Sequence, residues 1–335
     1  MTKTILLIKQ TSLGDVVHAT APIRSVRTAF PDAHITVLTS TTAADLFLNN
    51  RDIDVLLTFD RYRVKSDWWR HPCWALSHIW CSIKKVRSQQ FDLVIDLQGS
   101  WKTVMFLWAA RTRSRFVKGR WWFAQRFCDP RLHAIDEMNG VLQLCGVQPS
   151  QEQPILTVSQ KDHDRASLIL GKVLMSGKKL AVICPMTRWP TKNWSLINFV
   201  ELVDGITDKF FVVATGSFED RIHIDRALSS DSSERVMNLA GDLSLTEFIA
   251  VMDQADVVVA GDSLPMHVAS ALDRPLVALF GPTNEALVGP RSPRSLVLRA
   301  DVGCQRCYRR QFCKQNCINA IPVRSVINAI NRVTL

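Results

Sequence analysis

Two apolar runs joined by one helical segment constrain the fold of this chain more than any other feature. They lie in the stretch ADVVVAGDSLPMHVASALDRPLVALFGPT (255–283), at Val257–Ala260 and Leu276–Phe280. Runs without polar alternation are typical of strands buried on both faces of a parallel sheet and connected by a crossover helix. The first run breaks at GDS (261–263), where a capped helix start would attract an anion, most often a phosphate. Because ligands of open α/β sheets bind at the carboxyl ends of strands, the stretch predicts half of a nucleotide site; the alternative is an ordinary capped βαβ unit.

The same alternation of apolar runs and helical patterns occupies both halves of the chain. Further runs lie at Ile5–Ile8, Ile35–Leu38, Val55–Phe59, Leu93–Leu97, Leu180–Cys184 and Phe210–Ala214. This order predicts an α/β protein made of two doubly wound, Rossmann-like units. A length of 335 residues suits two domains, and we expect them at 1–155 and 156–321, connected through the Pro-, Gln- and Ser-rich stretch 146–160.

Neither a leader peptide nor a membrane span is visible in the sequence. The start MTKTILLIKQ has five apolar residues before Lys9, too few for a signal peptide. Apolar stretches such as Val104–Ala110 fall far short of the roughly 20 residues that a spanning helix needs. We therefore expect a soluble cytoplasmic protein.

Positive charge and tryptophan gather in one region of the first half. Between Arg61 and His133 there are 15 Lys/Arg and 4 Asp, whereas the whole chain carries a net charge of +10. Eight of the ten tryptophans lie there, from Trp68 to Trp122. Cations with amphipathic aromatic side chains suit an anionic membrane surface or a phosphorylated lipid. Binding of single-stranded nucleic acid and a solvated basic face with core tryptophans are the other two interpretations.

Three motifs, spread in order from residue 12 to residue 283, together resemble glycosyltransferase family 9, the heptosyltransferases of the bacterial lipopolysaccharide inner core. They are SLGDVVH (12–18), Pro185 with KNW (192–194), and GDSLPMH (261–267) with FGPT (280–283). The resemblance implies the GT-B architecture, in which two Rossmann-like domains face each other across a cleft and a final helix (322–335) packs back on the first domain. It also implies inverting, single-displacement transfer of heptose from ADP-heptose to a lipopolysaccharide acceptor of the lipid A–Kdo type, with no cofactor required for catalysis.

The first motif carries the predicted catalytic residue, Asp15. Its turn has one glycine rather than the three of a dinucleotide fingerprint, which argues against an NAD enzyme. A carboxylate at a helix start gains from the helix dipole, so a capping role is one interpretation. The resemblance implies the other, a general base that takes the proton from the acceptor hydroxyl. We expect the acceptor to be bound by Ser12, Gly14, His18, Arg111, Arg113 and Arg115; a buried histidine with a satisfied partner is the alternative for His18.

The second and third motifs carry the predicted donor site. A departing diphosphate needs fixed cations and donors, and Lys192 is the first candidate, with a solvated loop lysine as the alternative. Trp194 is expected to pack in the core. The other predicted donor-binding residues are Thr187, Arg188, Glu219, Asp262, Ser263, Leu264, His267, Gly281 and Thr283. The sequence departs from the family pattern at Trp189-Pro190 and at Ser263-Leu264, which bears on donor preference.

Four of the nine cysteines cluster near the C-terminus. Cys304, Cys307, Cys313 and Cys317 have the spacing C-x2-C-x5-C-x3-C. Four thiolates at this density could hold a structural zinc ion or an iron centre, or they could form a reduced, metal-free knuckle. The remaining five are scattered, as expected for reduced thiols in the cytosol.

We therefore expect a monomeric glycosyltransferase, peripherally bound to the inner membrane through its basic first domain and not binding nucleic acid. Two alternatives belong to other classes. A nucleotide-sugar epimerase can share this fold but has no use for the SLGDVVH motif. A membrane- or nucleic-acid-binding module with a degenerate pocket would keep the basic region and need neither Asp15 nor Lys192.

Overall fold

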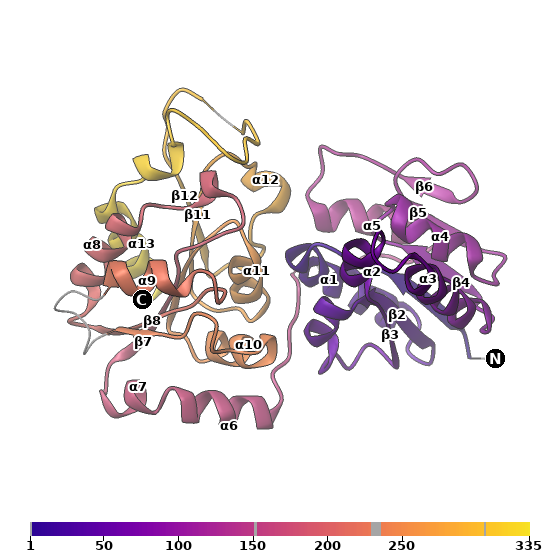
Figure 1. Ribbon diagram of the computed structural model, residues 1–335, viewed down its shortest axis with the longest axis horizontal. Coiled ribbons are helices and arrows are strands. Elements are labelled where there is room, and N and C mark those ends of the chain that lie inside the picture. Colours follow the sequence, from indigo (N-terminus) through magenta and orange to yellow (C-terminus); the bar gives the residue numbers. More distant parts are fainter. Residues whose placement is uncertain (1, 151–152, 229–235, 305) are drawn as a thin grey trace. The chain divides into compact units, whose positions relative to one another are not determined.

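Each half of the chain folds around one six-stranded sheet in which all paired strands run parallel (Figure 1). The computed structural model describes residues 2–150, 153–228, 236–304 and 306–335. The chain divides into two compact units after Leu156. Helices flank both sheets, so the predicted α/β class with two doubly wound units is confirmed.

In the first unit the strands stand in the order β3-β2-β1-β4-β5-β6. They are β1 Thr4–Ile8, β2 His34–Ser40, β3 Val55–Phe59, β4 Leu93–Asp96, β5 Arg115–Lys118 and β6 Gln125–Phe127. The helices are α1 Leu13–Ala29, α2 Arg61–Asp67, α3 Pro72–Arg87, α4 Trp101–Ala109 and α5 Ala134–Leu144, with a 3-10 segment η1 at Thr41–Phe47. The winding reverses between β1 and β4, so the turns after these two strands flank the switch point where open α/β sheets bind ligands.

The second unit repeats this topology with the order β12-β11-β10-β7-β8-β9. Its strands are β7 Lys179–Cys184, β8 Phe210–Ala214, β9 Val236–Asn238, β10 Val257–Gly261, β11 Leu276–Phe280 and β12 Ser295–Arg299. Its helical segments are α6 Gln160–Ile169, α7 Gly171–Met175, η2 Pro190–Lys192, α8 Leu196–Ile206, α9 Arg221–Leu228, α10 Leu245–Asp253, α11 Leu264–Ala271, α12 Glu285–Val288, η3 Cys317–Ala320 and α13 Val323–Val333. Here the turns after β7 and β10 flank the switch point.

The central strands are buried on both faces, as the continuous apolar runs predict. All five residues of β10 and of β11 are buried, and Ile5–Ile8 of β1 are at most 1% exposed. Trp194 packs in the second core, where its Nε1 donates to the carbonyl oxygen of Ile321 at 3.1 Å. Among the described residues, no helix is long and apolar enough to cross a bilayer.

The last helix, α13, packs in the second unit through its apolar face, and its packing back on the first domain stays a prediction. The buried residues Val323, Val326 and Ile330 form one stripe and lie in the same core as α8 and β11. Gly205 in α8 faces α13, since a Cβ there would stand 2.6 Å from the Cδ1 atom of Ile327. The apolar stripe of α13 is therefore already used within the second unit.

Candidate active site

Asp15 lies in the first turn of α1, at the switch point of the first sheet. Its Oδ2 atom accepts hydrogen bonds from the backbone nitrogen of Ser12 at 2.9 Å and from the Ser12 hydroxyl at 3.0 Å. This is the geometry of a capping box, so the capping role is real. The carboxylate is nevertheless only half-buried, whereas Gly14 beside it is buried. The cap fixes the position of the carboxylate, which is also what a general base needs.

The turn after β4 closes the other side of this switch point. Gln98 Oε1 accepts from the backbone nitrogens of Gln10 and Thr11 at 2.8 and 2.9 Å, which ties the two turns together. Asp96, at the end of β4, is fully buried, and its Oδ1 accepts from the backbone nitrogens of Gln98 and Gly99 at 2.9 Å. Burial raises the pKa of the Asp96 carboxyl to about 6, although these hydrogen bonds act in the opposite direction.

Other charged residues at this edge escaped the sequence prediction. Lys9, directly after β1, is buried; burial lowers the pKa of its amine, and the charge of Asp15 is the largest influence opposing that shift. Lys118, at the end of β5, forms an ion pair with Glu137 of α5 at 2.8 Å. In the sequence, these lysines could have been noticed because each ends or directly follows an apolar run. A single sequence does not show, however, which runs become neighbouring strands.

His18 is buried inside α1, which supports the alternative of a buried histidine. It is 2% exposed, and its ring centroid lies 5.2 Å from that of His133, the residue before α5. Direct contact between His18 and an acceptor therefore stays a prediction.

The three arginines predicted to bind the acceptor lie at the other edge of the first sheet. Arg115 begins β5, whereas Asp15 follows the end of β1, and parallel strands place their beginnings and ends at opposite edges. The Arg115 guanidinium donates to two carbonyl oxygens at the C-terminal end of α4, at 3.1 and 2.8 Å. Arg111 and Arg113 precede it in the same segment. The strand register therefore places these arginines away from Asp15, and their contact with the acceptor stays a prediction.

At the switch point of the second sheet, Lys192 and Asp262 form one charged cluster. The Lys192 amine lies 2.6 Å from Asp262 Oδ2 and 3.2 Å from the Asp262 carbonyl oxygen. The same amine stands 4.2 Å from the centroid of the Trp189 ring. His267 Nε2 lies 4.0 Å from the other carboxylate oxygen of Asp262. Residues that the sequence separates by 70 positions thus meet where the sequence predicted a donor site.

Thr187 holds the turn that carries Lys192. Its backbone nitrogen and its hydroxyl both donate to Asn193 Oδ1, at 2.7 and 2.8 Å. Gly261 packs beside this turn, since a Cβ there would stand 3.1 Å from the Lys192 carbonyl oxygen. Arg188 is exposed in the same turn.

The start of α11 adds backbone donors to this cluster. Ser263 is the N-cap residue, Leu264 is the first helical residue, and Pro265 follows within the first turn, where its missing N–H costs nothing. The first N–H groups of a helix lack intrahelical partners and attract anions. A cation beside such a helix start suits the negative charge that develops on a departing diphosphate.

Three other predicted donor residues occupy neighbouring turns. Gly281 and Thr283, after β11, are buried, and a Cβ at Gly281 would stand 3.1 Å from the Thr191 carbonyl oxygen. Glu219 is exposed after β8, where hydrogen bonds from its own backbone N–H and from Ser217 lower the pKa of its carboxyl. This geometry agrees with an acid at the start of a helix, and a contact of Glu219 with the donor stays a prediction.

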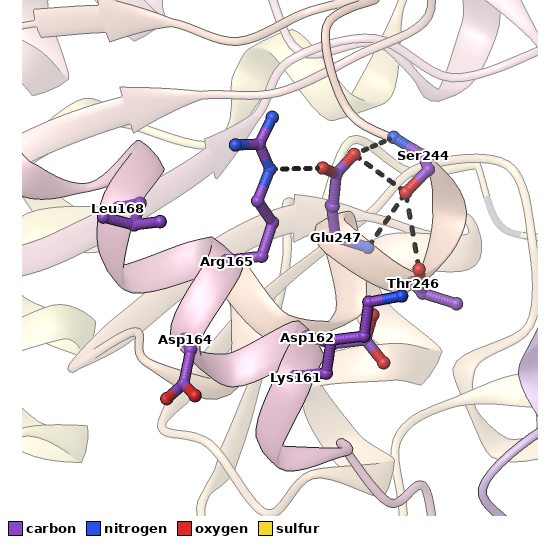
Figure 2. A pocket seen from close by; sticks show the side chains of 8 residues that line it. All are labelled: Lys161, Asp162, Asp164, Arg165, Leu168, Ser244, Thr246 and Glu247. Atoms are coloured by element: carbon purple, nitrogen blue, oxygen red, sulfur yellow. Dashed lines mark hydrogen bonds and ion pairs between the residues drawn. The ribbon is translucent and has the colours of Figure 1, made fainter.

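A hollow on the second unit contains none of the predicted site residues. It lies between α6 and α10, and Arg165 and Glu247 pair across it at 3.1 Å (Figure 2). Glu247 also accepts from the backbone nitrogen of Ser244 at the start of α10. Because Glu247 serves α10 and Arg165 and no predicted site residue lines the hollow, we do not assign the active site to it. Its lining residues are Lys161, Asp162, Asp164, Arg165, Leu168, Ser244, Thr246 and Glu247.

The structure places the four cysteines of the C-terminal cluster near one another. Burial raises the pKa of the Cys317 thiol, and the nearby thiols of Cys304, Cys313 and Cys307 raise it further. Yet among the described residues no three Cys, His, Asp or Glu side chains are placed to hold a metal ion. A structural metal ion at this cluster therefore stays a prediction.

Comparison with known proteins identifies the family. Residues 79–318, more than half of the chain, match the model of glycosyltransferase family 9 (heptosyltransferase). The chain belongs to this family. It is therefore a glycosyltransferase, which sets aside the epimerase and the binding-module alternatives.

Relatives match over nearly the full length. Lipopolysaccharide heptosyltransferase 3 of Escherichia coli is 22% identical over 333 residues, covering 96% of each chain. The crystal structure of a family 9 glycosyltransferase from Veillonella parvula has a TM-score of 0.86 at 21% identity and covers 99% of this chain and 97% of that one. The ADP-heptose lps heptosyltransferase II of E. coli has a TM-score of 0.78 at 21% identity, covering 100% and 98%. These likenesses confirm the GT-B fold.

Proposed function

We propose that this glycosyltransferase transfers heptose from ADP-heptose to an inner-core lipopolysaccharide acceptor. The names of relatives that match over nearly the full length support the donor and the acceptor class. The observation that carries the proposal is the pair of equivalent switch points. One presents the carboxylate of Asp15, and the other presents Lys192 and Asp262 beside the start of α11.

The proposed reaction is a single displacement with inversion. The acceptor hydroxyl oxygen attacks the anomeric carbon of heptose while the bond from that carbon to the diphosphate oxygen breaks. The electron pair of this bond leaves with ADP, and the hydroxyl proton passes to Asp15. Lys192 and the N–H groups of α11 stabilise the charge on the departing diphosphate. No metal ion or other cofactor takes part in these steps.

The test is transfer by the purified protein to lipopolysaccharide from a heptose-deficient strain. With ADP-heptose, ADP should be released and the acceptor mass should rise by one heptose. The new linkage should show the anomeric configuration opposite to that of the donor by NMR. Release of a nucleotide only from another nucleotide sugar would reject the donor, and a retained configuration would reject the displacement. Core oligosaccharide mass from a deletion strain would identify the position of the sugar.

We also propose that the first unit binds an anionic membrane surface, where a lipid-linked acceptor would lie. The two exposed positions of α4 are tryptophans: Trp101 and Trp108, seven residues apart, are 70% and 66% exposed, and Lys102 and Met105 are half-buried between them. The neighbouring α3 exposes Leu76 and Trp80, and neither helix contains an acid. Tryptophan favours the interface between water and lipid, and cations favour anionic headgroups.

Sedimentation with phosphatidylglycerol vesicles tests this surface. The double variant Trp101→Ser, Trp108→Ser should lose most of its vesicle binding, whereas Phe218→Ser, an equally exposed aromatic of the second unit, should not. Added salt should weaken wild-type binding because it screens the cations. Equal binding by the two variants, or preferential binding of single-stranded nucleic acid, would contradict the proposal.

A further inference from the structure

The segment between β12 and α13 lies directly against the turns of the second switch point. The Thr191 hydroxyl, next to Lys192, donates to the carbonyl oxygen of Arg309 at 2.5 Å. The backbone nitrogen of Tyr308 donates to the carbonyl oxygen of Pro282, in the turn after β11, at 3.0 Å. Residues 308–310 are thereby fixed beside the donor turns by their backbone, and their side chains are exposed.

This placement brings a second cation to Trp189. The Arg310 guanidinium carbon lies 4.5 Å from the centroid of the Trp189 ring, and the Lys192 amine lies 4.2 Å from the same centroid. A cation within about 6 Å of an aromatic ring centroid is attracted by its quadrupole. One tryptophan therefore holds a lysine and an arginine from segments that lie far apart in the sequence.

The two cations differ in how far their charge is already neutralised. Lys192 is paired with Asp262 at 2.6 Å. Arg310 has no acidic partner within 4.0 Å among the described residues, whereas Arg299 and Arg306 both pair with Glu285, at 3.0 and 2.7 Å. An exposed guanidinium without a carboxylate, held beside a lysine and a helix start, is suited to bind phosphate oxygens in bidentate fashion.

We propose that Arg310 is a further donor-binding residue, which contacts the diphosphate of the nucleotide sugar, and that Trp189 orients it. This rests on the proposed function, in which a nucleoside diphosphate leaves from this switch point. The Trp189 position, where the sequence departs from the family pattern, thereby acquires a role. The Trp189 ring holds Arg310, which belongs to the cysteine-containing segment, beside the donor turns.

Calorimetry with ADP and with adenosine tests the proposal. Arg310→Ala should weaken ADP binding about tenfold or more, because charge-assisted hydrogen bonds are the strong class, and should leave adenosine binding unchanged. Arg309→Ala is the matched control, since it removes an equal charge from the same segment and keeps the backbone contact to Thr191. Arg310→Lys should retain part of the affinity, and Trp189→Leu should lose part of it. Equal ADP affinity in the Arg309 and Arg310 variants, with thermal unfolding unchanged, would overturn the proposal.

Failure of the Arg310 proposal and failure of the proposed function give different results in these experiments. If the wild-type protein binds UDP or GDP instead of ADP, the donor assignment fails, and the same comparison on that nucleotide decides the role of Arg310. If the wild-type protein binds ADP and transfers no heptose, the reaction fails while a selective loss in Arg310→Ala still supports the phosphate contact.

Discussion

The two sheets share one strand order, yet the charged residues at their switch points have different environments. At the first, Asp15 is held by the cap of α1, Lys9 and Asp96 are buried, and burial shifts the pKa values of the latter two toward their neutral forms. At the second, Lys192 and Asp262 form a close pair. In the first unit, burial therefore shifts the pKa values of Lys9 and Asp96. In the second unit, the charges of Lys192 and Asp262 are fixed and neutralise each other.

This difference matches two chemical demands. A group that moves a proton works through its protonation state, which burial and neighbouring charges control. A group that stabilises a leaving diphosphate must stay charged and fixed throughout the reaction. We therefore expect substitutions at the first switch point to affect turnover and pH dependence, and those at the second to affect nucleotide affinity.

The substitution Asp15→Asn should have the largest effect, and it tests whether the first switch point controls turnover rather than nucleotide affinity. Asparagine keeps an oxygen that can accept from Ser12 but cannot accept the acceptor proton, so turnover should fall by about 10²–10⁴-fold with ADP affinity unchanged. Glu247→Gln, in the equivalent cap of α10, is the control and should leave turnover at the wild-type level. Stopped assays of ADP release measure both. Turnover of the Asp15 variant close to wild type would assign the aspartate to capping alone.

At the second switch point, Lys192→Ala should weaken ADP binding by roughly 10–150-fold, the equivalent of 1.5–3 kcal/mol for a charge-assisted contact. Arg188→Ala, in the same turn but exposed, should have a much smaller effect. The single variant also leaves Asp262 buried without its partner, which lowers stability. Adding Asp262→Asn should restore thermal stability without restoring ADP affinity. Calorimetry that finds wild-type affinity in Lys192→Ala would move the phosphate site to another residue.

The buried carboxyl of Asp96 makes the stability of the first unit depend on pH, which is a measurable property of the first switch point. Its folded pKa of about 6 exceeds the reference value of 3.8, so the folded state binds more protons between these values, and stability falls as pH rises from about 4 to 6. Asp96→Asn removes this dependence and keeps an oxygen that can accept from residues 98 and 99. Relative to wild type, the variant should gain up to about 3 kcal/mol in free energy of unfolding between pH 4 and pH 7. A difference that is flat across this range in urea titrations would place the pKa of Asp96 near its usual value.

The sequence was most informative where one local pattern decides the outcome. Continuous apolar runs predicted the parallel strands, and a carboxylate at an expected helix start gave capping as one interpretation of Asp15. The pairing of Lys192 with Asp262 was not visible, because it depends on β7 and β10 becoming neighbours. The same reason hid Lys9 and Asp96, which the pairing of β1 with β4 brings to one edge. The position of Arg115 was not visible either, because composition shows where cations gather along the chain and not at which edge of the sheet they lie.

The smallest expected effect is the difference in free energy of unfolding between substitutions of Arg115 and of Arg113. Its guanidinium satisfies two carbonyl oxygens at the end of α4, so Arg115→Gln should cost about 1–2 kcal/mol in free energy of unfolding, whereas Arg113→Gln should stay within about 0.5 kcal/mol. Neither change should alter donor KM, since the segment lies at the edge of the sheet opposite Asp15. Urea denaturation and steady-state kinetics with a lipopolysaccharide acceptor distinguish the possibilities. If Arg115→Gln leaves stability unchanged and raises only acceptor KM, this arginine binds the acceptor after all, and the first unit recognises its substrate at both edges of the sheet.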